Sequence, residues 1–295
     1  MKKILFRGVA TALITPFLPN GEVDCAGLKH NVAFQIENGI QALVPLGTTG
    51  ETPTLDEKER EAVMRVVVEA VRASRKDIPV IMGAGANSTK KTIENAKQAE
   101  AWGADAVLIV TPYYNKPTQA GIVAHFSAVS AAAKIPIIVY NIKSRTGTNI
   151  ETPTMRKLAQ LENIIAVKEA SGDIAQMMDV LDQVPDIAVY SGDDAMTLPL
   201  IALGGLGIIS VVSNLLPSRV VAMTNAALDG DIARARKIHF DLLPLFKGAF
   251  IETNPAPIKY AMNQRGLAAG SLRLPLVEMT AENQAKLDAV LTKFR

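Results

Sequence analysis

A lysine ends the apolar run in residues 164–173, whose sequence is IIAVKEASGD. Burial disfavours the charged form of an ammonium group, so an apolar environment would lower the pKa of Lys168. A neutral amine can attack a keto carbon to form an imine, and the protonated imine then accepts electrons. Lys168 is therefore a candidate Schiff-base nucleophile, although most lysines at strand ends extend their ammonium groups into solvent.

Imine and carbon–carbon bond chemistry also needs hydroxyl groups that move protons. Tyr140 ends the apolar run PIIVYN, and Thr48 and Thr49 lie in the segment GTTGE, residues 47–51. The backbone N–H groups and hydroxyls of GTTGE could hold a carboxylate, as anion-binding turns do. Two structural alternatives stay open: the threonines could only cap a tight turn, and Tyr140 could be a core residue with a satisfied hydroxyl.

The elements that would position these residues are short runs rich in Val, Ile and Leu that alternate with helical segments. Runs that are apolar throughout are typical of parallel strands covered on both faces. Eight such runs predict a (β/α)8 TIM barrel, in which residues that follow the strands share one catalytic face. An open doubly wound sheet is the alternative, but IMGAGANS offers only Gly83 and Gly85 toward its glycine fingerprint. The runs begin at Gly8, Gln41, Pro79, Asp105, Pro136, Ile164, Ile187 and Leu206.

Helical patterns occupy residues 55–74 and 89–103, and the second ends at Gly103, a typical C-terminal cap. The strand pattern stops near residue 230, and three further helical patterns follow it. We therefore expect residues 1–230 to form the barrel that carries the active site. Residues 231–295 would form a helical C-terminal extension packed on the barrel.

The composition favours an enzyme that acts on small molecules. The chain has 295 residues and a net charge of +2, which gives no electrostatic footprint for nucleic acid or an anionic membrane. Its one cysteine, Cys25, cannot form an internal disulfide, which suits a reducing compartment. Arg7 and Pro16 interrupt the N-terminal run that could resemble a signal peptide. We expect a cytoplasmic protein without a membrane segment.

The sequence shows no pattern for a metal site. The three histidines, His30, His125 and His239, are far apart and lack metal-ligand spacing, so we expect no metal. Asp193 and Asp194 follow the seventh run, where many barrels bind phosphate, and two acids there argue against a phosphate ligand.

The chain resembles the dihydrodipicolinate synthase and N-acetylneuraminate lyase family of class I pyruvate aldolases. The resemblance covers essentially the whole chain, and its ordered motifs are GVATALITPF, GTTGE, TPYYNKP, YN, VKEASGD, SGDD, GGLGIISV and NPAPIKYAM. It implies condensation of pyruvate with aspartate 4-semialdehyde in lysine and diaminopimelate synthesis. It also implies no cofactor other than a pyruvate imine on Lys168.

The same resemblance assigns roles to individual residues. It implies that Tyr140 is the main acid/base and that Thr48 links it to Tyr114. In the family the tyrosine that matches Tyr114 comes from a neighbouring subunit, which implies a homotetramer built as a dimer of dimers.

Substrate-binding residues follow from the family pattern as well. The resemblance implies that Thr49 and Ile209 seat pyruvate through backbone groups, with Gly192 close by. Arg145, in SRTG, is typical of the synthase branch, where an arginine binds the carboxylate of the second substrate. A guanidinium suits this role because it can form two parallel hydrogen bonds with a carboxylate.

Two positions depart from the family pattern. Lys143 stands where a proline is usual, and we expect its loss to loosen the loop that carries Arg145 and to affect the choice of second substrate. Glu57, Arg60 and Lys91 stand at positions that form the lysine-binding regulatory pocket of regulated relatives. Lys91 would repel the ammonium of an effector lysine, so we expect feedback inhibition to be weak or absent.

Three other functions remain as alternatives. An N-acetylneuraminate lyase or 2-keto-3-deoxy-sugar aldolase would use the same imine chemistry, and Arg145 argues against both. A metal- or phosphate-dependent barrel hydrolase or isomerase is disfavoured by the scattered histidines and by the acids of SGDD. A barrel that binds a keto acid without turnover would not need the lysine, tyrosine and threonine set.

Overall fold

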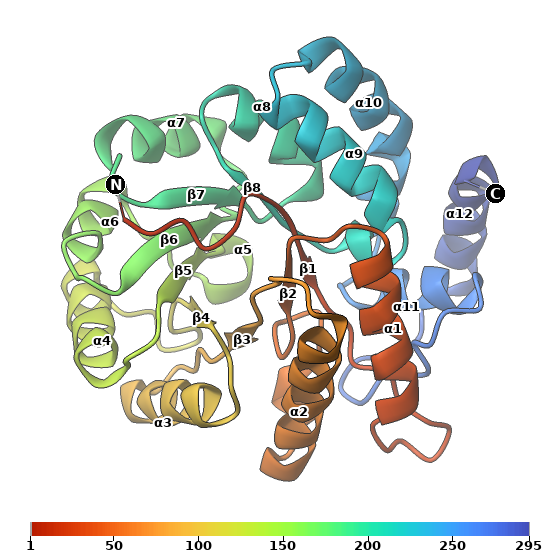
Figure 1. Ribbon diagram of the computed structural model, residues 1–295, viewed down its shortest axis with the longest axis horizontal. Helices are drawn as coiled ribbons and strands as arrows, with labels where there is room; N and C mark the ends of the chain where they lie inside the picture. The colour runs from red at the N-terminus through yellow and green to blue at the C-terminus, as the bar shows by residue number, and fades with distance from the viewer. Residues whose placement is uncertain (1, 295) are drawn as a thin grey trace.

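Eight parallel strands form a barrel in the computed structural model, which describes residues 2–294. The sheet has the strand order β2-β1-β8-β7-β6-β5-β4-β3, and a parallel bridge from Leu43 to Val80 joins its two ends. Helices surround the strands (Figure 1), so the predicted (β/α)8 TIM barrel is confirmed. The strands are β1 (Gly8–Ala12), β2 (Ala42–Val44), β3 (Ile81–Gly83), β4 (Ala106–Val110), β5 (Ile137–Asn141), β6 (Ile164–Glu169), β7 (Ala188–Ser191) and β8 (Gly207–Ser210).

The inside of the barrel is a packed core. Small side chains such as Ala42 and Ala106 point inward beside Tyr140 and Ile209. Phe6, which precedes β1, fills the end of the barrel where the strands begin, and its ring lies parallel to that of Tyr190 on β7 at 4.2 Å, with a hydrogen bond from the Tyr190 hydroxyl to the Phe6 carbonyl. Functional side chains must therefore gather at the other end, where the strands finish.

Helices follow the strands and cover the outside of the barrel. The predicted helix over residues 55–74 begins at Glu57, where Asp56 and Glu59 form a reciprocal capping box. Gly103 follows the next predicted helix with a left-handed φ of 83°, as its capping role requires. These helices are α1 (Cys25–Glu37), α2 (Glu57–Ser74), α3 (Thr89–Ala101), α4 (Gln119–Ala132), α5 (Lys143–Thr146), α6 (Thr152–Leu158), α7 (Ile174–Gln183), α8 (Thr197–Ala202) and α9 (Pro217–Leu228).

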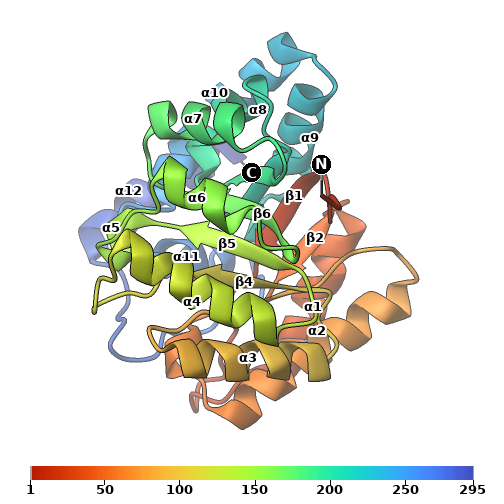
Figure 2. The same ribbon diagram turned by 90° about the vertical axis from the view of Figure 1, so that its left-hand side faces the viewer.

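Further helices follow the barrel toward the C-terminus. The first of them packs on α8 and α9, and the last packs on its two predecessors. Figure 2 shows α11 and α12 on the same side of the barrel as α5. No helix within residues 2–294 is long and apolar enough to cross a membrane. The additional helices are α10 (Ile232–Gly248), α11 (Ala256–Asn263) and α12 (Ala281–Leu291), and short 3-10 turns are η1 (Thr52–Thr54), η2 (Asp194–Met196), η3 (Val212–Asn214) and η4 (Thr292–Phe294).

Candidate active site

Lys168 lies near the end of β6 and is only 5% exposed. Tyr140 is its register partner on β5, and the Lys168 Nζ atom lies 4.3 Å from the centre of the Tyr140 ring. Burial lowers the pKa of Lys168 to about 8, with the Asp194 carboxylate acting against this shift and Arg145 adding to it. Roughly a tenth of this lysine is therefore an uncharged nucleophile at pH 7, far more than for a lysine with its usual pKa.

Tyr140 is buried beside this amine. Its burial raises the pKa of the phenol to about 12, while nearby Arg145 and a hydrogen bond with Thr48 oppose that shift. At neutral pH the phenol keeps its proton and can donate it to a group bound at Lys168. The structure thus brings Lys168, Tyr140, Thr48 and Arg145 together.

Asp194 supplies the negative charge on the other side of Lys168. Its buried carboxylate accepts a hydrogen bond from the Ser210 hydroxyl at 2.5 Å and another from the Val211 amide at 3.1 Å. Burial raises the pKa of Asp194 to about 6 despite these hydrogen bonds. The sequence had indicated Asp194 only as an argument against phosphate, and its electrostatic pairing with Lys168 was not foreseen.

One of the predicted pyruvate-binding residues lies against Lys168, and another lies in the barrel core. A Cβ atom on Gly192 would stand 3.0 Å from Cε of Lys168 and 2.6 Å from the Cβ of Ala170, so only glycine leaves room for the lysine side chain. Ile209 on β8 is fully buried in the same interior cluster as Tyr140. Gly192 therefore lies directly against the lysine side chain, and Ile209 belongs to the core inside the barrel.

Residues 47–51, here named the threonine turn, form the next wall of the site. Thr49 is buried, and its hydroxyl accepts a hydrogen bond from the Asn254 side-chain amide at 3.0 Å. Arg145 in turn donates to the Asn254 backbone carbonyl at 3.2 Å. Asn254 therefore joins the turn to the arginine. The sequence did not reveal this role, because Asn254 is 205 residues from Thr49 and 109 residues from Arg145.

The segment with Lys143 in place of proline forms the single helical turn α5. The Thr146 hydroxyl lies 2.8 Å from the Thr148 carbonyl and 3.0 Å from the Ile142 carbonyl, either of which can accept its one proton, and it accepts from the Thr148 amide at 3.2 Å. These contacts tie the two ends of this turn together. Lys143 itself is exposed. The turn and the Asn254 contact together hold Arg145 beside Lys168 and Tyr140 without the proline.

Tyr114 is the predicted site residue that the chain does not bring into its own site. It is 89% exposed, in the loop after β4, and its backbone has a left-handed φ of 71°. A non-glycine residue in that conformation is uncommon and is often held there for function.

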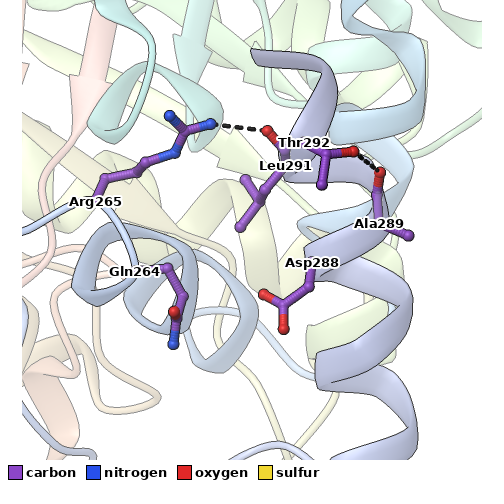
Figure 3. A pocket seen from close by; sticks show the side chains of 6 residues that line it. All are labelled: Gln264, Arg265, Asp288, Ala289, Leu291 and Thr292. Atoms are coloured by element: carbon purple, nitrogen blue, oxygen red, sulfur yellow. Dashed lines mark hydrogen bonds between the residues drawn. The ribbon is translucent and has the colours of Figure 1, made fainter. Parts of the chain in front are cut away.

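A surface pocket lies elsewhere, between α11 and α12 (Figure 3). It has a volume of about 380 Å³, and Arg265 crosses it to donate to the Leu291 carbonyl at 2.8 Å. None of the predicted site residues lines it, and no group of three or more potential metal ligands occurs within residues 2–294. Its lining residues are Gln264, Arg265, Asp288, Ala289, Leu291 and Thr292.

Comparison with known proteins agrees with the geometry of the barrel site. Residues 5–294 match the model of the Dihydrodipicolinate synthetase family. The chain belongs to this family. It is 50% identical over 292 residues to the 4-hydroxy-tetrahydrodipicolinate synthase of Protochlamydia amoebophila, covering 98% of this chain and 96% of that one.

Solved structures of family members have the same fold. The dihydrodipicolinate synthase of Thermotoga maritima superposes with a TM-score of 0.95 at 44% identity, covering 98% of this chain and 99% of that one. A monomeric dihydrodipicolinate synthase variant superposes with a TM-score of 0.94, also at 44% identity, covering 98% and 97% of the two chains. The resemblance inferred from the motifs is therefore confirmed, and the protein is a lyase-type enzyme of the class I aldolase family.

Proposed function

We propose that the protein condenses pyruvate with L-aspartate 4-semialdehyde to give 4-hydroxy-tetrahydrodipicolinate, and that no cofactor takes part. The neutral Nζ of Lys168 attacks the keto carbon of pyruvate, and water leaves to give an imine. Loss of a methyl proton then gives an enamine, whose carbon attacks the aldehyde carbon of the second substrate. The amino group of that substrate finally attacks the imine carbon, closes the ring and releases Lys168.

Each site residue has a role in the proposed reaction that follows from its position. Tyr140, with its proton retained at neutral pH, donates to the oxygen that leaves as water, and Thr48 carries protons to and from the phenol. Thr49, Gly192 and Ile209 would border bound pyruvate. Arg145 offers the cation that the carboxylate of the semialdehyde requires.

The observation that carries the proposal is the buried Lys168 amine, with a pKa near 8, lying 4.3 Å from the Tyr140 ring. Borohydride reduction in the presence of pyruvate tests it. We expect the peptide that contains Lys168 to gain the mass of the reduced adduct, and Lys168→Arg to abolish that gain. An unmodified peptide under saturating pyruvate would reject the imine mechanism.

The second substrate requires a separate assay. An N-acetylneuraminate lyase or 2-keto-3-deoxy-sugar aldolase would pass the borohydride test, but Arg145 and the names of the relatives favour the semialdehyde. Turnover of aspartate semialdehyde with pyruvate should therefore exceed cleavage of N-acetylneuraminate. The reverse order would support the alternative.

We also infer that the protein works as a cytoplasmic homotetramer, a dimer of dimers, in which residues 1–230 form the catalytic barrel and residues 231–295 its helical extension. The exposed Tyr114 supports one contact between subunits. Phe240, which is 61% exposed on α10, and Leu203 at the end of the adjoining α8 offer apolar surface for a second. The single cysteine suits a reducing compartment.

A further inference from the structure

An ion pair is fully buried behind the threonine turn. Lys259 on α11 and Glu51, the last residue of the turn, have side chains that are 2% and 0% exposed, and Nζ lies 2.7 Å from Oε1. The ammonium group also donates to the carbonyls of Thr15 at 3.0 Å and Ser271 at 2.6 Å, so all three of its protons are used. The second carboxylate oxygen accepts from the Arg273 amide at 3.0 Å.

A pair this deep is a weak source of net stability, because desolvation of both charges offsets much of their attraction. Well-packed apolar residues could replace it with little loss, so its presence calls for another explanation. The location supplies one. Glu51 has a left-handed φ of 53°, which a non-glycine residue keeps only when its surroundings hold it there, and Thr48 lies three positions earlier in the same turn.

We propose that the Glu51–Lys259 ion pair is a positioning device that holds the threonine turn so that the Thr48 hydroxyl meets Tyr140. This inference rests on the proposed function, because it assigns the pair to the proton relay of that reaction. Neither charge touches the reacting atoms. Lys259 acts from α11 through Glu51, and Asn254, which comes just before α11, holds Thr49 in the same turn.

Several contacts hold the threonine turn, and they come from different segments of the chain. The Thr15 hydroxyl donates to the Gly50 carbonyl at 2.7 Å, while the Thr15 carbonyl accepts from Lys259. The Phe17 ring, two residues further on, lies 4.3 Å from the Lys259 ammonium. The segment that follows β1, the threonine turn and α11 thus meet at one buried cation.

The test replaces the two charges together by Glu51→Gln and Lys259→Met, so that neither is left buried alone. We expect the double variant to fold and to trap pyruvate on Lys168, because the amine is untouched. Its kcat should fall by about 10- to 100-fold, the range expected when a catalytic group is displaced by about 1 Å. A positioning role also predicts that the double change has no further effect in a Thr48→Val background, since the affected hydroxyl is already absent.

A merely structural pair would behave differently. Its loss would lower the melting temperature, leave kcat of the folded enzyme unchanged, and act independently of Thr48→Val. If the double variant fails to fold, Glu51→Asp keeps the charges but shortens the reach by one methylene, and it should lower kcat in the same way. Wild-type kcat in either folded variant would overturn the proposal.

A nearby ion pair provides the matched control. Arg273 also pairs with Glu59, and both of these side chains are partly exposed. Glu59→Gln removes that charge and keeps the capping box of α2. The Arg273 guanidinium still donates to the carbonyls of Gly21 and Thr54, so the Arg273 amide keeps its hydrogen bond to Glu51. We expect Glu59→Gln to leave kcat unchanged. Trapping of pyruvate by the wild-type enzyme tests the proposed function separately, because that reaction does not depend on Glu51 or Lys259.

Discussion

One physical cause, burial, moves the proton affinities of Lys168 and Tyr140 in opposite directions. It lowers the pKa of the amine to about 8 and raises that of the phenol to about 12. The neutral form is favoured in both cases, because a charge is costly in an apolar site. The result is a nucleophile and a proton donor that coexist at neutral pH, the pairing of roles that imine formation needs.

The rate of imine formation should therefore depend on pH through Lys168. Because the neutral amine is the nucleophile, borohydride trapping at limiting pyruvate should accelerate as pH rises through about 8. Asp194 stabilises the ammonium form of Lys168. Asp194→Asn should therefore lower the lysine pKa and move the rise in trapping rate to lower pH. Asp193→Asn is the control, since Asp193 is not among the charges that shift Lys168. If the trapping rate of Asp194→Asn rises over the same pH range as that of the wild-type enzyme, the electrostatic account is wrong.

Gly192 offers a steric test of the same amine. The added methyl group of Gly192→Ala would press on both Lys168 and Ala170, and we expect kcat/KM for pyruvate to fall by about 10- to 100-fold. Ala170→Gly in the Gly192→Ala background removes the contact with Ala170 but leaves the contact with Lys168. Activity should stay low in that double variant. Full recovery would show that the lysine side chain had never been displaced.

At the scale of elements, the strands were predictable and the contacts between distant segments were not. Strands of a parallel sheet are covered on both faces, so a continuous apolar run such as residues 164–167 marks a strand directly. Lys168 could be singled out because it stands at the end of that run. No local sequence pattern predicts the Asn254–Thr49 and Lys259–Glu51 contacts. Each joins the threonine turn to the region of α11, more than 200 residues away in the sequence. Tyr114 was singled out by resemblance alone, since no pattern within one chain shows where an exposed side chain is used.

The prediction about feedback inhibition by lysine concerns residues on α2 and α3. Arg60 is buried on α2, where it donates to Asn95 at 3.3 Å and lies 5.9 Å from the Trp102 ring, and Lys91 on α3 pairs with Glu94. Because cations stand at Arg60 and Lys91, an added ammonium group would be repelled. Initial rates should therefore be unchanged by lysine at physiological concentrations.

The matched variant for this prediction replaces both cations with side chains that can accept a hydrogen bond from the ammonium of an effector lysine. Lys91→Glu combined with Arg60→His should introduce measurable inhibition by lysine, and arginine at the same concentration controls for general effects of a cation. Inhibition of the wild-type enzyme by lysine but not by arginine would show that these two helices still form a regulatory pocket.

At the scale of the whole molecule, one chain holds an incomplete version of the proposed relay. Lys168, Tyr140 and Thr48 come together within the barrel, while Tyr114 projects from the loop after β4 and is almost fully exposed. A left-handed backbone at Tyr114 directs this side chain outward at a conformational cost. The family resemblance implies that this tyrosine completes the site of a neighbouring subunit, and its exposure agrees with that proposal.

Mixed assemblies can decide whether Tyr114 acts across that interface. Lys168→Ala and Tyr114→Phe should each be nearly inactive alone, because one lacks the nucleophile and the other lacks the distal hydroxyl. If the tyrosine serves the neighbouring subunit, a hybrid dimer has one site with both residues intact, and random pairing should restore about a quarter of the wild-type activity. If it serves its own subunit, neither site of the hybrid is complete and mixing restores nothing. The recovered activity should also vanish on dilution below the concentration at which the dimer dissociates, because the complete site exists only while two different chains share it.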